Sequence, residues 1–349
     1  MRLPIGLNDW KTLFAGASAL ALLAACGNGG EETDATPATP PAQSTDTDET
    51  PQDPGEERAS NQSTASTETG IDPVEVSEGP GTPALWTLSD EDTTVYIFGT
   101  VHLLKPELEW RTPELDAALA SIDTLYTEAD VLSSDAQAEA QTLVMDLGML
   151  DNGETLTAIL DDEEEKEVRE ALDILGVPMA ALDPMEPWMA GVTLSQIAVM
   201  NQGYTPGAGV ESVLIGEAQA AGKELAYFET VEEQLNFFAN LPDEDQVDFL
   251  VASAEVIENE PDMLDRLVAE WAEGDIEGLG DMMADPGAFG SQAVYDVLLV
   301  ERNRNWIPQI EAILEEPGTF MVAVGAGHLA GDDSVITMLR DKGYEVTGP

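Results

Sequence analysis

The fold is decided by a stretch near the end of the chain, FMVAVGAGH, which occupies residues 320–328. A near-continuous apolar run of this kind is typical of a buried strand. A second stretch, TVYIFGTVH at residues 94–102, is built in the same way. In both stretches a Gly-x-x-His pattern directly follows the strand-like run. The two segments therefore predict two strands of one sheet, each followed by a histidine.

The chain contains only two histidines, His102 and His328, and each is the fourth residue of a Gly-x-x-His pattern. A strand delivers its carboxyl end to the edge of the sheet, where open α/β folds bind ligands, and glycine permits a sharp turn or a close approach there. Imidazole at such a place can transfer protons near neutral pH or bind a divalent metal ion. A single histidine is more often structural, but the repeated arrangement favours a functional pair.

Further strand-like and helix-like segments surround these two. Residues 84–88, a polar turn and residues 94–98 predict a hairpin. From about 134 to 279 apolar residues recur mostly at helical spacing. The remaining patterns predict short strands at 124–128, 224–229 and 344–347 and helices at 113–122, 212–221, 301–306, 308–316 and 334–342. The expected fold is α/β: a mixed β-sheet core built from N- and C-terminal strand–Gly-x-x-His segments, with a large helical insertion between them.

The first 25 residues predict a secretion signal. Arg2 and Lys11 form a thin basic region, and the apolar stretch at 13–25 is shorter than the roughly 20 residues that a membrane-spanning helix needs. The stretch ends in Leu-Ala-Ala-Cys, which resembles the lipobox of bacterial lipoproteins and predicts lipidation of Cys26. An ordinary cleavable signal with an incidental cysteine is the alternative. Cys26 is the single cysteine, so the chain has no intramolecular disulfide or thiolate metal cluster.

Residues 26–80 are expected to be a lipidated cysteine followed by a disordered acidic tether. Residues 27–80 contain no Leu, Phe, Trp or Tyr and hold thirteen acids against one base, Arg58, so they offer little apolar surface to bury. Residues 81–349 remain for the folded domain. Gly27 after the cysteine resembles an outer-membrane sorting signal. We therefore expect secretion across the inner membrane and a lipid anchor in the outer membrane, facing the periplasm.

The charge of the chain limits its partners. It carries 13 Lys and Arg residues against 69 Asp and Glu residues, a formal net charge of −56. Nucleic acid and anionic lipid headgroups would be repelled, so we expect no nucleic-acid partner and membrane contact only through the lipid anchor. The acids are spread through the chain, as on a surface adapted to a saline environment. Calcium binding by clustered carboxylates is an alternative, but no D-x-[DN]-x-[DN]-G loop is present.

Several motifs resemble those of one protein family, the TraB/GumN family, which includes the Tiki metalloproteases. The similarity runs from about Trp86 to Val346. The segments that carry it are FGTVH at 98–102, YTEAD at 126–130, GAGVE at 207–211, YFETVEEQ at 227–234, ERN at 301–303 with Trp306, and VGAGHLAG at 324–331. The resemblance implies hydrolytic activity, because the animal Tiki members are metal-dependent proteases and the bacterial TraB member acts against a peptide pheromone.

The resemblance also implies roles for particular residues. His102 and His328 are candidate metal ligands or proton-transfer groups, and Glu128 is their candidate carboxylate partner. Glu229 is a further candidate ligand, although it could instead cap the helix that follows it. Arg302 is a candidate catalytic residue that could bind a substrate carboxylate, or it could simply pair with an acid.

Two further residues of these segments can be explained without a role in the site. Glu211 is more simply a helix-start residue, and Trp306 is more simply a core residue.

Two classes of function follow from these residues. The leading hypothesis is an envelope hydrolase, a metal-dependent peptidase acting on a peptide or protein substrate, in which two histidines and a carboxylate hold one divalent ion. No H-E-x-x-H motif is present, so it would not be a zincin. A metal-free variant would use a histidine as general base. The rival is a non-catalytic envelope lipoprotein that binds a peptide or partner. Convergence of His102, His328 and Glu128 in one cleft would favour the hydrolase.

Overall fold

A computed structural model of the chain describes residues 81–283 and 289–349. The signal expected at 1–25, the lipidated Cys26 and the tether expected to end at residue 80 lie outside these described residues and stay predictions. Among the helices of the described residues, none is both long and apolar enough to cross a membrane.

A six-stranded mixed sheet forms the centre of the fold. In chain order its strands are β1 (Leu85–Ser89), β2 (Thr93–Thr100), β3 (Thr124–Thr127), β4 (Glu224–Tyr227), β5 (Gly318–Gly325) and β6 (Val346–Thr347). Their order across the sheet is β4-β3-β5-β2-β1-β6. The expected hairpin is present, since β1 pairs antiparallel with β2. The strands β2, β5, β3 and β4 run parallel to one another.

The two Gly-x-x-His segments lie side by side at one edge of this sheet. The long strand β5 is inserted between β2 and β3, and it pairs with β2 over its full length. In this register Gly99 lies opposite Val324, and Thr100 lies opposite Gly325. Because the pairing is parallel, both strands end at the same edge. The expected sheet core built from the two segments is confirmed.

Helices fill the rest of the described chain. Before β4 come α2 (Pro113–Ser121), α3 (Ser134–Leu147), α4 (Leu156–Ile159), α5 (Asp162–Leu175), η1 (Met179–Ala181), α6 (Pro187–Asn201), η2 (Pro206–Ala208) and α7 (Val210–Ala220). After β4 come α8 (Val231–Ala239), α9 (Asp243–Asn259), α10 (Met263–Glu273), α11 (Ile276–Met283), α12 (Gln292–Tyr295), η4 (Asp296–Val300), α13 (Glu301–Ile313), η5 (Ala326–Leu329) and α14 (Val335–Asp341). The large helical insertion is confirmed, with β4 as the one expected strand inside it.

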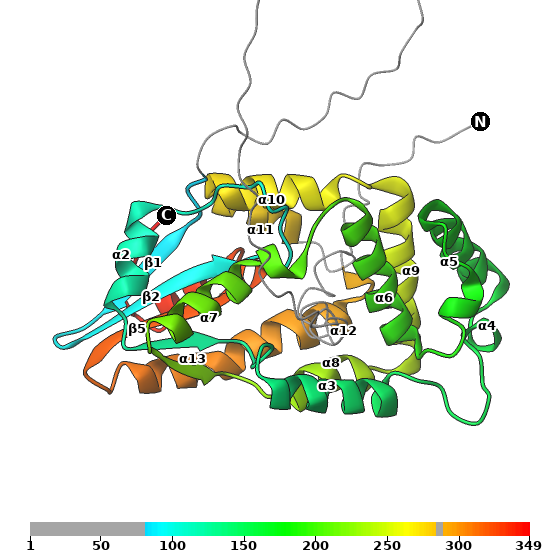
Figure 1. The fold of residues 1–349 in the computed structure, drawn as a ribbon, viewed down its shortest axis with the longest axis horizontal. Helices are drawn as coiled ribbons and strands as arrows, with labels where there is room; N and C mark the ends of the chain where they lie inside the picture. The colour runs from blue at the N-terminus through cyan, green and yellow to red at the C-terminus, as the bar shows by residue number, and fades with distance from the viewer. Residues whose placement is uncertain (1–80, 284–288) are drawn as a thin grey trace, which may run out of the picture. The chain divides into compact units, whose positions relative to one another are not determined.

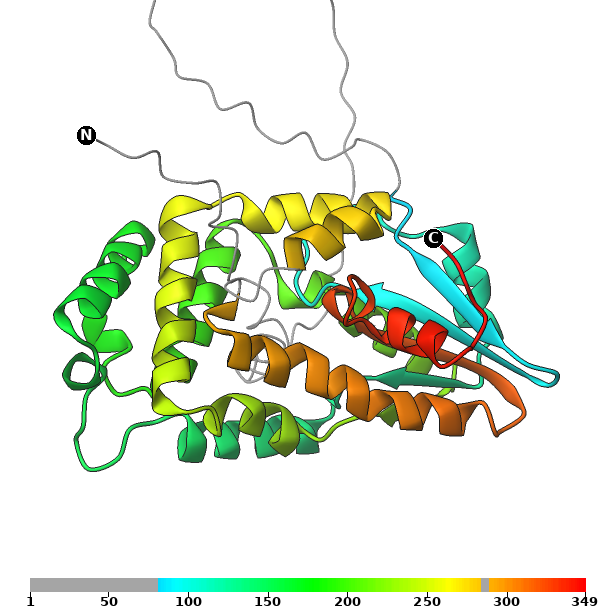
Figure 2. The ribbon, with the colours of Figure 1, turned by 180° about the vertical axis from the view of Figure 1, so that it is seen from behind.

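The alternation of side chains along β5 explains why its sequence is apolar throughout. Phe320, Val322 and Val324 enter a core shared with α13 and α14. Met321 and Ala323 enter a core on the opposite face, shared with α2 and α7. Figure 1 shows α2 and α7 on one side of the strands, and Figure 2 shows α13 and α14 on the other. A strand covered on both faces has no polar side to display.

The insertion has a core of its own. Helices α5, α6 and α9 bury Val168, Leu172, Leu194 and Leu250 against one another. The carboxyl ends of the parallel strands β2, β3, β4 and β5 point toward the helices of the insertion in both ribbon views (Figures 1 and 2). The edge that carries the histidines is therefore covered by helices.

One expected boundary is wrong. A new helix was expected to begin at Pro308, but α13 continues through this proline. Proline removes one backbone N–H and frees the carbonyl of the residue four positions earlier, here Arg304. Both residues are exposed, so water can satisfy that carbonyl. The same helical stretch opens with α12 and the π-helical turn η4, directly before α13, the helix that carries Arg302.

Candidate functional site

Each of the four parallel strands is followed by one of the residues singled out from the sequence. His102 follows β2, Glu128 follows β3, Glu229 follows β4 and His328 follows β5. Because parallel strands end at a common edge, these four side chains come from neighbouring points. Nε2 of His328 lies 3.9 Å from Oε1 of Glu128. The structure therefore brings the predicted residues together in one region.

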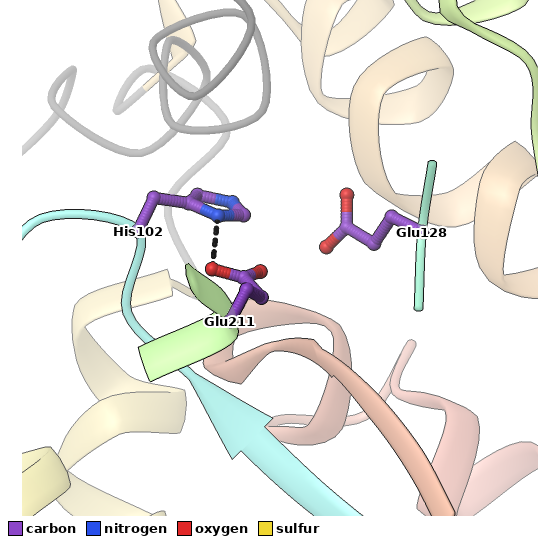
Figure 3. A group of neighbouring side chains, drawn as sticks. All are labelled: His102, Glu128 and Glu211. Carbon is purple, nitrogen blue, oxygen red and sulfur yellow. Dashed lines mark hydrogen bonds and ion pairs between the residues drawn. The ribbon is translucent and has the colours of Figure 1, made fainter. Parts of the chain in front are cut away.

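His102 is held by a carboxylate that the sequence analysis assigned to the start of a helix. Its Nδ1 lies 2.6 Å from Oε2 of Glu211, which is 6% exposed at the start of α7. The other oxygen of Glu211 accepts a hydrogen bond of 2.7 Å from the Thr100 hydroxyl. Figure 3 shows the imidazole ring facing the Glu211 carboxylate. The expectation that Glu211 starts a helix is correct in position, but its carboxylate belongs to the site.

Close backbone packing brings the two partners together. The amide of Val210 donates to the carbonyl of Val101 at 2.9 Å, one residue from each partner. A side-chain β-carbon added at Gly209 would lie only 2.0 Å from the carbonyl oxygen of His102. Only glycine permits this approach. The glycine of the motif that ends at Glu211 is thus explained by the need to seat one chain segment against the other.

Glu128 completes a group of three possible metal-binding side chains. His102, Glu128 and Glu211 each offer one ligand atom, and these atoms lie within 4.8 Å of one another. Figure 3 shows the Glu128 carboxylate pointing toward the other two. A cavity of about 20 Å³ adjoins them and is also lined by Thr127, Ile215 and Gln234. About 10–15 Å³ of such space holds one water molecule, so the cavity can hold a water or a small ion.

Arg302 is hydrogen-bonded to Glu128, one member of this group, and is 2% exposed. Its Nη2 donates to Glu128 Oε2 at 2.6 Å and to Glu229 Oε2 at 2.7 Å, and its Nε donates to Glu229 Oε1 at 2.9 Å. Its Nη1 faces the carbonyl of Leu298 at 3.3 Å and Nε2 of His328 at 3.2 Å. A guanidinium has five N–H groups, and this set of partners is enough to engage all of them.

Glu229 is surrounded by donors. Besides Arg302, the indole N–H of Trp306 donates to its Oε1 at 2.9 Å, and the amide of Gln234 donates to its Oε2 at 3.0 Å. It is not one of the three grouped ligand atoms. Its position is that of a counter-charge for Arg302, although the ligand role assigned from the resemblance stays a prediction.

His328 has a partner at each ring nitrogen. Nδ1 lies 2.6 Å from Oδ1 of Asn303, and Nε2 lies 3.2 Å from Nη1 of Arg302. Its ring packs against Trp306 with the centroids 4.4 Å apart. His328 is 5% exposed, and it is likewise absent from the group of three ligand atoms. The two histidines share a motif but have different surroundings.

Comparison with known proteins agrees with these motifs. A model of the TraB/PrgY/gumN family matches residues 84–348. The chain belongs to the TraB/PrgY/gumN family. Similar relatives include the uncharacterized protein YbaP of Escherichia coli, 24% identical over 245 residues that cover 70% of this chain and 87% of YbaP. An uncharacterized protein of Treponema pallidum is 23% identical over 270 residues, 74% of this chain and 80% of its own. No solved structure matches the chain.

The charges of this TraB/PrgY/gumN site are set by burial and by close partners. Burial by itself would raise the pKa of Glu128, but the Arg302 charge outweighs it and, together with both histidines, holds that pKa well below its usual range. Glu128 is therefore ionised. Burial and the Arg302 charge lower the pKa of His328 to about 3. His328 is therefore neutral at ordinary pH.

His102 responds in the opposite direction. Burial by itself would lower its pKa, but the charge and hydrogen bond of Glu211, with a contribution from Glu128, outweigh burial and raise it. The pKa values of the two histidines of the family motif are therefore shifted in opposite directions, and the two rings also have different partners.

Some residues of the site escaped the reading of the sequence. Asn303 and Gln234 lie inside the family segments, yet no role was assigned to them. Trp306 was expected to be a core residue, and it is buried in the core while its N–H bonds Glu229. The signal for Glu211 was its place at the end of the segment 207–211, where glycines precede the acid.

Proposed function

We propose that this protein is an envelope-anchored, metal-dependent hydrolase, a peptidase that acts on a peptide or protein substrate. The observation that carries the proposal is the group formed by His102, Glu128 and Glu211, whose ligand atoms lie within 4.8 Å of one another beside a cavity the size of one water molecule. The choice of a peptide or protein substrate rests on the resemblance to the Tiki metalloproteases.

The three side chains fit a divalent metal ion. One imidazole and two carboxylates are donors that such ions accept in catalytic sites. Ligand atoms that sit about 2.0–2.2 Å from one ion are at most roughly 4 Å apart, so the group needs to tighten by less than about 1 Å. Carboxylate oxygens have two lone pairs each. The oxygens of Glu211 that accept from Thr100 and His102 therefore keep capacity for an ion.

Each residue of the group has a distinct task. The Nδ1–H of His102 donates to Glu211, which leaves Nε2 as the nitrogen with a lone pair. Glu211 fixes the orientation and tautomer of that ring. Glu128 is held in place by the backbone N–H of Gly325 at 2.7 Å and by Arg302. When bound, a divalent ion would polarise a scissile carbonyl and lower the pKa of a water.

The decisive experiment measures metal and cleavage on the purified full chain. We expect one divalent ion per chain by elemental analysis and cleavage of a peptide library that a chelator abolishes. Glu211→Gln should weaken metal binding by at least about 10- to 100-fold, because it alters a carboxylate ligand and also the partner that orients His102. Glu217→Gln, on the exposed face of the same helix, is the matched control and should change neither metal binding nor peptide cleavage. A chain that holds no ion and cleaves no peptide would favour the rival, a peptide- or partner-binding lipoprotein.

The envelope anchor has its own test. The Leu-Ala-Ala-Cys ending of the signal supports lipidation of Cys26, and Gly27 after it supports attachment to the outer membrane. The net charge of −56 supports the absence of a nucleic-acid partner. Cys26→Ser should move the protein from the membrane fraction to the soluble fraction. Continued membrane association of this variant would exclude the lipid anchor.

A further inference from the structure

His328 is the histidine of the second Gly-x-x-His motif. The hydrogen bonds of its ring are compatible with only one protonation state. Asn303 donates through Nδ2 to the backbone carbonyl of Asp333 at 2.8 Å, and this bond fixes which end of the amide faces the ring. The amide oxygen therefore lies 2.6 Å from His328 Nδ1. Since an amide oxygen can only accept, Nδ1 carries the hydrogen.

The other nitrogen of the same ring is equally constrained. Nε2 of His328 lies 3.2 Å from Nη1 of Arg302. A guanidinium can only donate and stays charged in proteins, so Nε2 accepts with its lone pair. A metal ion bound to Nε2 would need that same lone pair and would have to displace a cation that is 2% exposed.

Arg302 passes this constraint on to Glu128. Its Nη1 faces His328, while its Nη2 donates to Glu128 Oε2 at 2.6 Å. The guanidinium is planar and rigid, so an acceptor that fixes one nitrogen fixes the direction of the other. The ring of His328 is itself held by Trp306 at 4.4 Å between centroids.

We infer that His328 is a positioning residue and not a metal ligand: its neutral ring, with the hydrogen on Nδ1, orients Arg302, which holds Glu128 toward His102 and Glu211. The inference rests on the proposed metal site. It divides the family's repeated motif into one histidine that binds the metal ion and one that aligns the carboxylate. The three grouped ligand atoms, which include His102 and not His328, agree with this division.

Nuclear magnetic resonance on the full chain labelled with ¹⁵N-histidine tests the tautomer. The chain has only two histidines, so two rings appear, and His328→Gln assigns them. We expect the His328 ring at neutral pH to carry its hydrogen on Nδ1, with or without added Zn²⁺, and the His102 ring to shift when Zn²⁺ is added. A hydrogen on Nε2 of His328, or a shift of its Nε2 resonance on addition of Zn²⁺ as large as that of the His102 ring, would overturn the inference.

Cobalt binding, followed by visible absorption, tests the division of roles. His328→Ala should weaken Co²⁺ binding about 10- to 100-fold, as loss of a residue that holds a ligand does. His328→Gln should restore most of that affinity with an unchanged spectrum, because the amide oxygen can accept from Arg302 in place of Nε2. His102→Gln is the matched variant of the other motif and should abolish the signal.

The outcomes separate this inference from the proposed function. If His328→Gln loses Co²⁺ as completely as His102→Gln, then His328 is a ligand and the inference is wrong while the metal site stands. If the wild-type chain binds neither Co²⁺ nor Zn²⁺, the proposed function is wrong. In that case the tautomer of His328 still decides whether its ring orients Arg302.

Discussion

The two Gly-x-x-His segments have the same sequence pattern and neighbouring positions, but their histidines face different partners. They leave adjacent parallel strands at one edge, with Thr100 opposite Gly325. His102 faces a carboxylate, Glu211, and the cavity. His328 lies between an amide, Asn303, and a guanidinium, Arg302. Its partners thus come from the helix α13, whereas Glu211 comes from α7.

This difference shows which properties of a histidine a Gly-x-x-His motif determines. The strand and the glycine determine where the backbone of each histidine leaves the sheet. The acceptors and donors on other elements determine whether the ring is charged and which nitrogen is available. A repeated motif therefore predicts a shared location more reliably than a shared role.

The largest effect is expected where the His328 side is disrupted. Arg302→Met should lower the free energy of unfolding by about 3–5 kcal/mol, because it leaves buried carboxylates without their cation; Glu128 and Glu229 are its partners. Urea unfolding followed by circular dichroism measures the loss. Arg304→Met, two residues further along the same helix and exposed, is the control and should stay within about 0.5 kcal/mol of the wild type. A similarly small loss in Arg302→Met would show that the buried charges do not stabilise the fold.

An intermediate effect is expected at the two motif glycines. A β-carbon at Gly99 would lie 3.1 Å from Cα of Ala326, a backbone atom, so Gly99→Ala should destabilise the protein by about 1–3 kcal/mol through overpacking. A β-carbon at Gly325 would lie 3.1 Å from Oε1 of Glu128 and 3.8 Å from Nε2 of His102. Gly325→Ala should therefore chiefly disturb metal binding.

Thermal unfolding and Co²⁺ titration of both alanine variants test the pair together. Equal losses of stability with equal losses of metal binding would mean that the two glycines have the same role. That result would contradict the difference between the two Gly-x-x-His segments.

A further effect is expected in the pH dependence of stability, where the two histidines should differ in sign. The pKa of His328 is lowered to about 3, so the unfolded chain binds a proton that the folded chain refuses. Its effect is a loss of stability as pH falls from about 6.5 toward 3. The pKa of His102 is raised, so the stability it contributes is present below about 6.5 and is lost as pH rises through the folded pKa.

Unfolding of the wild type, His102→Gln and His328→Gln, measured from acid to alkaline pH, gives the contributions of the two histidines to the free energy of unfolding. The difference between wild type and His328→Gln should shrink on the acid side, and the difference between wild type and His102→Gln should shrink on the alkaline side. Two differences that change in the same direction would contradict the assigned environments.

Much of the fold could be predicted because its strongest signals are local. The strand-like runs that became β5 and β2 could be recognised without knowledge of distant residues. The position of β5 between β2 and β3 could not be predicted from local sequence, because strand order depends on packing of the whole chain. The continuation of α13 through Pro308 also depended on context, since the exposure of that helix face decides whether the freed carbonyl meets water.

The site was predictable to a lesser degree. His102, Glu128, Glu229, His328 and Arg302 were identified from strand ends and from family motifs, and the structure places them in one region. Glu211 looked like an ordinary helix start because its sequence neighbourhood does not reveal the contact between Gly209 and His102. Asn303 carried no charge to attract notice, although its amide fixes the His328 ring.

The place of β5 has a consequence for how the chain is made. A ribosome completes β1 to β4 long before it reaches residue 318 of 349, yet β5 pairs with both β2 and β3. Those two strands have no direct pairing with each other in the sheet order. Contacts between segments so distant in sequence form slowly, and here they must await the synthesis of residues 318–325. A nascent chain that stops before β5 therefore has neither the centre of the sheet nor the paired motifs, and any activity that needs both motifs begins only after residue 328 has been made.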